Sequence, residues 1–189
     1  MLTTVLENID GTIYNVINDK TVCDELHKQI GFLKVKNIKY NFHSKEAHHI
    51  TVAYRSEHGA LLLTKIENIN ISIMHLLKAD KFIITNHRFD PKLYKGIILY
   101  GDIYKNKFAI HAVKFDSYNE RIGDNLERFD QILFNQYKED TDLEPLSIVI
   151  KEFYASVAEI PKNKDHKGIL YLNPVIGSIH YLEFTSNDI

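Results

Sequence analysis

The 189-residue sequence predicts an α+β protein in which antiparallel β-sheets pack against about three helices. Many short runs rich in Ile, Val, Leu, Tyr and Phe are separated by short polar turns, a pattern typical of antiparallel strands. Three other stretches carry apolar residues at helical spacing. No repeat or Gly/Ser/Pro-rich linker interrupts the chain, so we expect a single domain over residues 1–189.

The first predicted helix begins near Thr21 and stops at Gly31. Thr21 and Asp24 resemble a capping box, and glycine is a common helix stop. One face of this helix is apolar: Val22, Leu26 and Ile30.

Two more helices are predicted in the second half of the chain. One begins near Asp124, which pairs with Glu127 in the same capping pattern, and its apolar stripe is Leu126, Phe129, Ile132, Leu133 and Tyr137. The other follows Pro145 and ends before Pro161, with the stripe Leu146, Val149, Ile150, Phe153, Tyr154 and Val157. From these stripes we expect four buried side chains: Phe129, Ile132, Phe153 and Val157.

The remaining apolar runs predict strands. Residues Ile50, Val52 and Tyr54 alternate with other side chains, and residues 56–59 are expected to turn the chain. Residues 97–104 and 107–114 should form a hairpin around the turn 105–107. The other predicted strands lie within residues 60–66, 70–77, 81–86, 168–172 and 178–184.

Composition excludes several classes of protein. The 23 basic and 25 acidic residues give a net charge of −2, which does not favour nucleic acid binding in bulk. A single cysteine, Cys23, excludes an intramolecular disulfide framework and a cysteine-based zinc finger. No apolar run approaches the roughly 20 residues of a membrane span. We therefore expect a soluble, cytoplasmic protein without a membrane contact.

Common catalytic and metal motifs are not found in the sequence. There is no P-loop, dinucleotide-binding glycine fingerprint, G-x-S-x-G elbow or H-E-x-x-H. His48 and His49 are adjacent, so on a strand they point to opposite faces and chelate poorly. Cys23 has His27 one helical turn later, but a half-buried structural cysteine is the commoner situation. We expect no metal site and no cofactor.

Three segments resemble, in order, the motifs of one enzyme family. They are AYRSEHGALLLTKI (53–66), GIILYGDIYKNKFAIHAVKFDSYNERIGDNLERF (96–129) and HKGILYLNPVIGSIHYLEF (166–184). Together they resemble the covalent nucleotidyltransferases, particularly the guanylyltransferase domain of poxvirus-type mRNA capping enzymes. Over residues 50–184 the resemblance implies antiparallel sheets flanking a nucleotide cleft, and we expect no OB-fold lid after them.

The resemblance also locates a vestigial nucleotide pocket: Ser56, His58, Gly59, Gly101, Asp102, Lys167, Gly168 and Glu183. Ser56 stands where the family has its nucleophilic lysine. A hydroxyl without an adjacent base is a far poorer nucleophile than a lysine amine, and because it has no nitrogen it cannot form the phosphoramidate. Glu183 stands where phosphate requires a cation. Asp102 alone offers too few oxygen ligands for Mg²⁺. We therefore assign no catalytic residue.

The leading functional hypothesis is a catalytically inactive, guanylyltransferase-like binding or scaffold subunit. Its expected partner is a protein, in a viral mRNA capping or transcription complex or as a host factor that it antagonises. Exposed aromatics on edge strands, or the acidic surface of residues 116–144, could form the interface. One alternative is an active RNA guanylyltransferase or RNA ligase-like enzyme that uses Lys65 or Lys45. A further alternative is a non-catalytic RNA-binding module that uses the N-terminal lysines Lys34, Lys36, Lys39 and Lys45.

Overall fold

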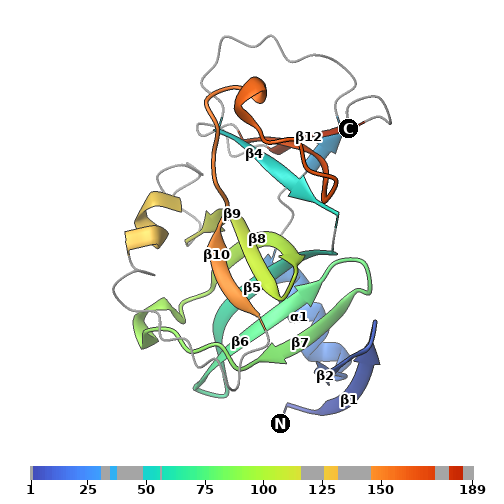
Figure 1. Cartoon of the computed structure of the whole chain (residues 1–189). Coiled ribbons are helices and arrows are strands. Elements are labelled where there is room, and N and C mark those ends of the chain that lie inside the picture. Colours follow the sequence, from blue (N-terminus) through green and yellow to red (C-terminus); the bar gives the residue numbers. More distant parts are fainter. Residues whose placement is uncertain are drawn as a thin grey trace.

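The computed structural model describes residues 2–30, 35–37, 49–55, 57–115, 126–131, 146–172 and 179–184. Their strands form two sheets, which lie in the lower and upper parts of Figure 1. In spatial order, the large sheet contains β1 (Thr4–Ile9), β2 (Thr12–Ile17), β7 (Lys81–Thr85), β6 (Ile69–Leu76), β5 (Glu57–Ile66), β8 (Ile97–Tyr104), β9 (Lys107–Lys114) and β10 (Ser147–Ile150). The small sheet contains β3 (Val35–Asn37), β12 (Ile179–Glu183), β11 (His166–Leu172) and β4 (His49–Tyr54).

The predicted hairpin of β8 and β9 is confirmed. The strands pair antiparallel, and the turn residues Lys105 and Asn106 have φ values of 46° and 60°. Two successive positive φ angles give a turn whose twist matches that of the flanking strands. The α+β class and the mainly antiparallel pairing are also confirmed. Two pairs are parallel: β9 with β10, and β3 with β12.

The hairpin of β1 and β2 was not predicted. Its turn is Asp10-Gly11, where φ is 49° and 87°. The dipeptide Asp-Gly between two β-prone runs is a strong signal for a two-residue hairpin. This signal was available in the sequence, and the hairpin adds an edge to the large sheet beside β7.

The first predicted helix is confirmed as α1 (Lys20–Ile30). Its N-cap is Asp19, whose Oδ1 accepts a hydrogen bond from the Val22 amide at 3.1 Å. The cap therefore lies upstream of the predicted Thr21/Asp24 pair. Leu26 and Ile30 are buried against one face of the large sheet, as their spacing predicts.

The second predicted helix is helical over residues 126–131, the part that the structure describes. Phe129 is fully buried and Leu126 is buried, so this half of the stripe is confirmed. The predicted start at Asp124 and the later stripe residues Ile132, Leu133 and Tyr137 lie outside the described residues. A short 3₁₀ helix, Pro91–Leu93, lies in the connection between β7 and β8.

The third predicted helix, after Pro145, is wrong. Residues Ser147–Ile150 form β10 beside β9, and the chain then runs to a single 3₁₀ turn at Val157–Glu159. The run Ile148-Val149-Ile150 is β-branched throughout, and the free edge of β9 offers it hydrogen bonds. Because the segment is extended, Val157 is 44% exposed instead of buried, and Phe153 is only partly buried.

The predicted turn over residues 56–59 is wrong for its last three residues, because β5 already begins at Glu57. The chain leaves β4 of the small sheet and enters β5 of the large sheet within this short segment. The crossing brings the start of β5 next to the small sheet, where several of the predicted pocket residues lie.

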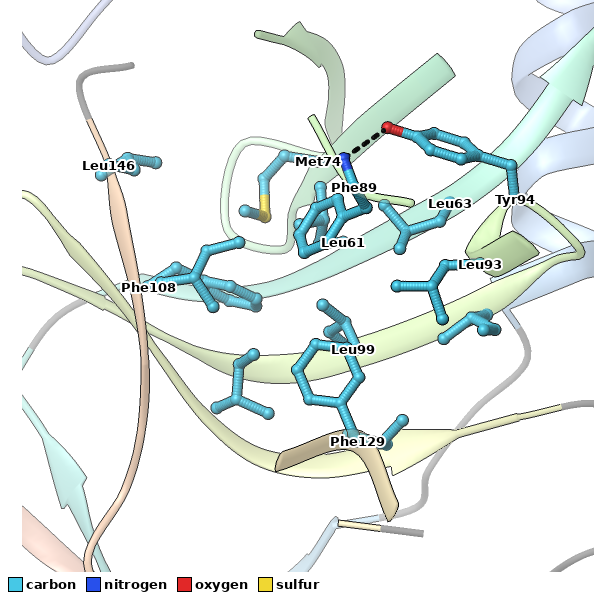
Figure 2. Close-up of a cluster of buried hydrophobic side chains, with 14 of the residues drawn as sticks. Leu61, Leu63, Met74, Phe89, Leu93, Tyr94, Leu99, Phe108, Phe129 and Leu146 are labelled. Atoms are coloured by element: carbon cyan, nitrogen blue, oxygen red, sulfur yellow. Dashed lines mark hydrogen bonds between the residues drawn. The ribbon is translucent and has the colours of Figure 1, made fainter. Parts of the chain in front are cut away.

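The core lies on both faces of the large sheet. Residues 59–64 of β5 are all buried: Leu61 and Leu63 face one apolar cluster, and Ala60 and Leu62 face the other. Figure 2 shows the first cluster, where Leu61, Leu63, Leu99, Phe108 and Phe129 converge. A strand covered on both faces carries a continuous apolar run, which explains the sequence ALLLT. None of the helices in the described part of the chain is long and apolar enough to cross a membrane.

Candidate functional site

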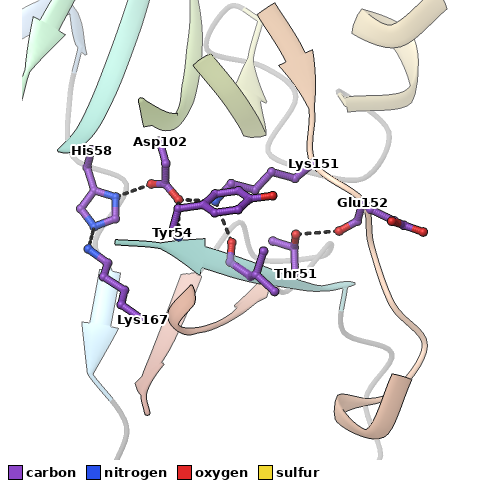
Figure 3. A network of polar contacts seen from close by, with 8 residues as sticks. Thr51, Tyr54, His58, Asp102, Lys151, Glu152 and Lys167 are labelled. Carbon is purple, nitrogen blue, oxygen red and sulfur yellow. Dashed lines mark hydrogen bonds and ion pairs between the residues drawn. The ribbon is translucent and has the colours of Figure 1, made fainter. Parts of the chain in front are cut away.

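A polar network joins the two sheets at the ends of β5 and β8. His58 on β5 and Asp102 on β8 are cross-strand partners in the large sheet. Tyr54 and Lys167 come from β4 and β11 of the small sheet, and Lys151 directly follows β10. Figure 3 shows His58 and Lys151 beside the Asp102 carboxylate, with Lys167 on the other side of the His58 ring.

Asp102 lies at the centre of this network and has no exposed surface. Its carboxylate accepts hydrogen bonds from His58 Nδ1, from Lys151 Nζ and from the Tyr54 amide. Burial alone would raise the pKa of Asp102. The hydrogen bond from His58 and the positive charge of Lys151 outweigh this effect and hold the pKa well below its usual range. Asp102 is therefore an ionised carboxylate whose two oxygens are both engaged by donors.

Lys151 is the buried counter-ion of Asp102. Its side chain is completely buried, and Nζ donates to Asp102 Oδ2 and to the Val52 carbonyl of β4 at 2.8 Å. Burial lowers the pKa of Lys151, and the attraction of Asp102 opposes that shift. A buried pair of this kind is costly to break, because removing one partner leaves the other charge uncompensated. The pair therefore fastens the large sheet to β4.

His58 links the buried pair to the small sheet. Lys167 Nζ lies within hydrogen-bond distance of His58 Nε2. An ammonium group is only a donor, so this contact makes Nε2 the acceptor and places the imidazole proton on Nδ1, which donates to Asp102. The side chain of His58 is 36% exposed, so this end of the network meets solvent.

The segment after β10 makes further contacts with β4. Thr51 Oγ1 donates to the Glu152 carbonyl at 2.7 Å, and the Tyr154 amide donates to the Ile50 carbonyl at 2.8 Å. Thr51 is fully buried, so its hydroxyl requires such a partner. These bonds keep Lys151 in place between the sheets.

Packing between strands explains why glycine occupies two of the predicted pocket positions, without any bound ligand. A Cβ on Gly101 would lie 2.2 Å from the Ala109 carbonyl oxygen, and one on Gly168 would lie 2.3 Å from the Leu182 carbonyl oxygen. Both glycines therefore permit close approach of neighbouring strands. Gly59, the cross-strand partner of Gly101, has only a moderately close neighbour, Met74 Sδ at 3.0 Å from its Cβ position.

The structure brings most of the predicted pocket residues together. His58 contacts both Asp102 and Lys167, and Gly59 and Gly101 lie next to His58 and Asp102 on the two adjacent strands. Gly168 follows Lys167 and pairs with the exposed Glu183 across β11 and β12. Ser56 lies outside the described residues.

Lys151 is the central residue that sequence reasoning missed. The predicted third helix assigned it no role, because its neighbours were interpreted as a helical stripe. Its signal was a lone lysine directly after the strand-like run Ile148–Ile150. A lysine in such a position is buried only with a partner, and Asp102 is that partner.

The network does not fit the divalent metal that the family resemblance implies. Mg²⁺ requires several oxygen ligands, usually including carboxylates and water. Among the residues that the structure describes, the one buried carboxylate is Asp102, and Lys151 already neutralises it. The nearby side chains of His58 and Lys167 are not oxygen ligands. No metal-dependent step is therefore assigned to these residues.

Cys23 is a half-buried cysteine, as the sequence predicts for a structural role. Its Sγ donates to the Ile17 carbonyl over 3.6 Å. Burial raises the pKa of its thiol, with further contributions from Asp19 and Asp24. A raised pKa reduces the thiolate fraction, so Cys23 is poorly suited to act as a nucleophile.

Comparisons with known proteins do not assign the chain to a family. No protein-family model matches it. No curated protein matches its sequence. The order of motifs and the network around Asp102 are therefore the basis for the function proposed below.

Proposed function

We propose that this chain is a catalytically inactive, guanylyltransferase-like protein that works as a binding or scaffold subunit. The observation that carries the proposal is the fully buried Asp102–Lys151 ion pair. It occupies the place where the motif resemblance puts an open nucleotide pocket. In this proposal the former nucleotide cleft of a nucleotidyltransferase-like domain is filled by the chain's own lysine, and the cytoplasmic protein binds another protein.

The contacts around Asp102 argue against nucleotidyl transfer. The reaction needs an accessible amine nucleophile and cations that neutralise the transferred phosphate. Lys151 is buried, and Nζ donates to two oxygens. Lys65 is exposed, but it lies seven residues along β5 from His58, which corresponds to about 23 Å. The alternative nucleophile Lys45 lies outside the described residues.

An adduct assay tests the absence of catalysis. The full chain is incubated with Mg²⁺ or Mn²⁺ and α-labelled GTP or ATP, then denatured and examined for a covalent lysyl–nucleotide. We expect no label on the protein, because Asp102 and Lys151 neutralise each other and Ser56 replaces the family's lysine. Label that survives denaturation and is lost in Lys65→Ala, Lys45→Ala or Lys151→Met would establish an active enzyme instead.

The edge of the large sheet supports binding to a protein partner. β1 is an edge strand, and its hairpin exposes three large apolar side chains: Val5 (43%), Leu6 (78%) and Ile13 (67%). Exposed apolar edge strands are often recognised by addition of a strand from another chain. The exposed large hydrophobics among the described residues are aliphatic, not the aromatics that the sequence suggested. Most of the acidic surface over 116–144 lies outside the described residues.

Site-specific cross-linking tests this interface. A photoreactive amino acid is placed at Leu6 or Ile13, and as a control at Asp130, which is exposed on the 126–131 helix. In cells that contain the native partner, we expect a discrete cross-linked protein from positions 6 and 13 only. Equal products from all three positions would contradict an interface at this edge.

The RNA-binding alternative depends on the N-terminal lysines. Of these, only Lys36 lies in a described element, β3, and the net charge of −2 gives no general attraction to RNA. Gel-shift titration with single-stranded RNA at about 50 and 200 mM salt separates the hypotheses. Salt-sensitive binding that Lys34→Ala/Lys36→Ala abolishes would favour the RNA-binding module.

A further inference from the structure

Three potential metal ligands lie close together where β6 ends and the turn to β7 begins. His27 lies in the last turn of α1, His75 on β6, and Asp80 in the turn between β6 and β7. The Nε2 atoms of both histidines lie 2.9 Å from Asp80 Oδ1. The ligand atoms of all three residues lie within 4.8 Å of one another. The fold thus joins residues that are separated in the sequence by as many as 53 positions.

The two imidazoles are held in place by Phe82. The ring of His75 stacks on Phe82 with a centroid distance of 4.6 Å, and the ring of His27 meets Phe82 edge-on at 4.7 Å. His75 is only 8% exposed, whereas the side chains of His27 and Asp80 are 43% and 66% exposed. One side of the cluster is therefore rigid and apolar, and the other is open to solvent.

Two of the three ligand–ligand distances are close to those around a tetrahedral ion, and the two histidine nitrogens lie within 4.8 Å of each other. With bonds of about 2.0–2.1 Å, neighbouring ligands of zinc are about 3.3 Å apart. The two contacts of 2.9 Å to Asp80 need to lengthen by only a few tenths of an ångström. An ion would take the place of the protons that the Nε2 atoms donate to the carboxylate.

The ligand types also point to a particular class of ion. Two imidazole nitrogens and one carboxylate oxygen suit Zn²⁺ and related divalent transition metals, whereas Mg²⁺ and Ca²⁺ prefer oxygen ligands. The hydrogen bonds from His27 and His75 hold the pKa of Asp80 below its ordinary value, so its carboxylate is ionised. Three protein ligands would leave a fourth position for water on the exposed side.

We propose that His27, His75 and Asp80 form a zinc-binding site that ties the end of α1 to the β6–β7 turn. The site lies outside the Asp102 network and does not depend on the function proposed above. The proposal differs from the expectation of no metal site, which considered only histidines that are close in the sequence.

Zinc titration of the full chain tests the site. After treatment with a chelator, Zn²⁺ is added by isothermal titration calorimetry or in competition with a chromophoric chelator. We expect one Zn²⁺ per chain, together with a rise in the unfolding temperature, because an ion that binds only the folded state stabilises it. Asp80→Asn and His27→Gln should each weaken zinc binding by more than about 10-fold. Replacing a residue that only orients a metal ligand already lowers metal affinity by about 10-fold or more, and these two residues are the ligands themselves.

Asp10→Asn is the matched control. Asp10 and Asp80 both lie in exposed turns, with φ angles of 49° and 50°, which asparagine tolerates. Asp10→Asn should bind zinc like the unmodified chain. Zinc binding that is unchanged in Asp80→Asn and His27→Gln, or no binding by the unmodified chain, would overturn the proposal.

Discussion

At the scale of single residues, the ion pair of Asp102 and Lys151 is completely buried and leaves neither of these two charges free. Asp102 was singled out from the motif resemblance, and in the structure it contacts His58, which in turn contacts Lys167. Lys151 could not be identified in the same way, because only the tertiary fold brings it to a carboxylate 49 positions away. The motifs therefore pointed to Asp102, but not to the lysine that neutralises its charge.

The buried pair should dominate the stability of the junction between the sheets. Lys151→Met leaves the Asp102 charge buried without its main counter-ion and should lower the free energy of unfolding by about 3–5 kcal/mol. Adding Asp102→Asn to this variant should restore part of the loss, because it removes the unpaired charge. Urea unfolding measures both effects. Lys114→Met, at an exposed position of β9, is the control, and an equal loss there would contradict the assignment.

At the scale of elements, local signals were reliable where the chain pairs with its sequence neighbours. The β8–β9 hairpin, the strands β6 and β7, and α1 were predicted close to their observed bounds. The segment after Pro145 was not, because apolar residues at helical spacing also occur in a β-branched strand followed by an irregular segment. The free edge of β9 decided between the two structures, and it is not visible in the local sequence.

The contrast between the two predicted stripes can be measured. Phe129→Ala should lower the free energy of unfolding by about 3–5 kcal/mol, because the ring is fully buried in the core of Figure 2. Val157→Ala should change it by less than about 0.5 kcal/mol, because Val157 is 44% exposed on a 3₁₀ turn. Urea midpoints for the two variants test this order. Similar losses would indicate that residues 146–160 pack as a helix after all.

At the scale of the whole molecule, buried histidines make the fold sensitive to acid. His111 lies on β9 at the bulge opposite Tyr100 and Gly101, and it is buried near the Asp102–Lys151 pair. Burial lowers the pKa of His111 to about 3, and the positive charge of Lys151 contributes in the same direction. The folded protein therefore holds His111 neutral under conditions where a solvent-exposed imidazole is already charged.

The free energy of unfolding should fall as the pH is lowered from about 6.5, the ordinary pKa of histidine, towards 3. In this range the unfolded chain binds a proton at His111 that the folded protein does not, so acid favours unfolding. The contribution of this one group is at most about 1.4 kcal/mol per pH unit. His111→Gln removes the titrating group, so its stability should depend less steeply on pH between about 6 and 4. Urea unfolding at several pH values gives both slopes. Equal slopes for the two proteins would show that His111 already takes up its proton in the folded state, or that it is not buried as described.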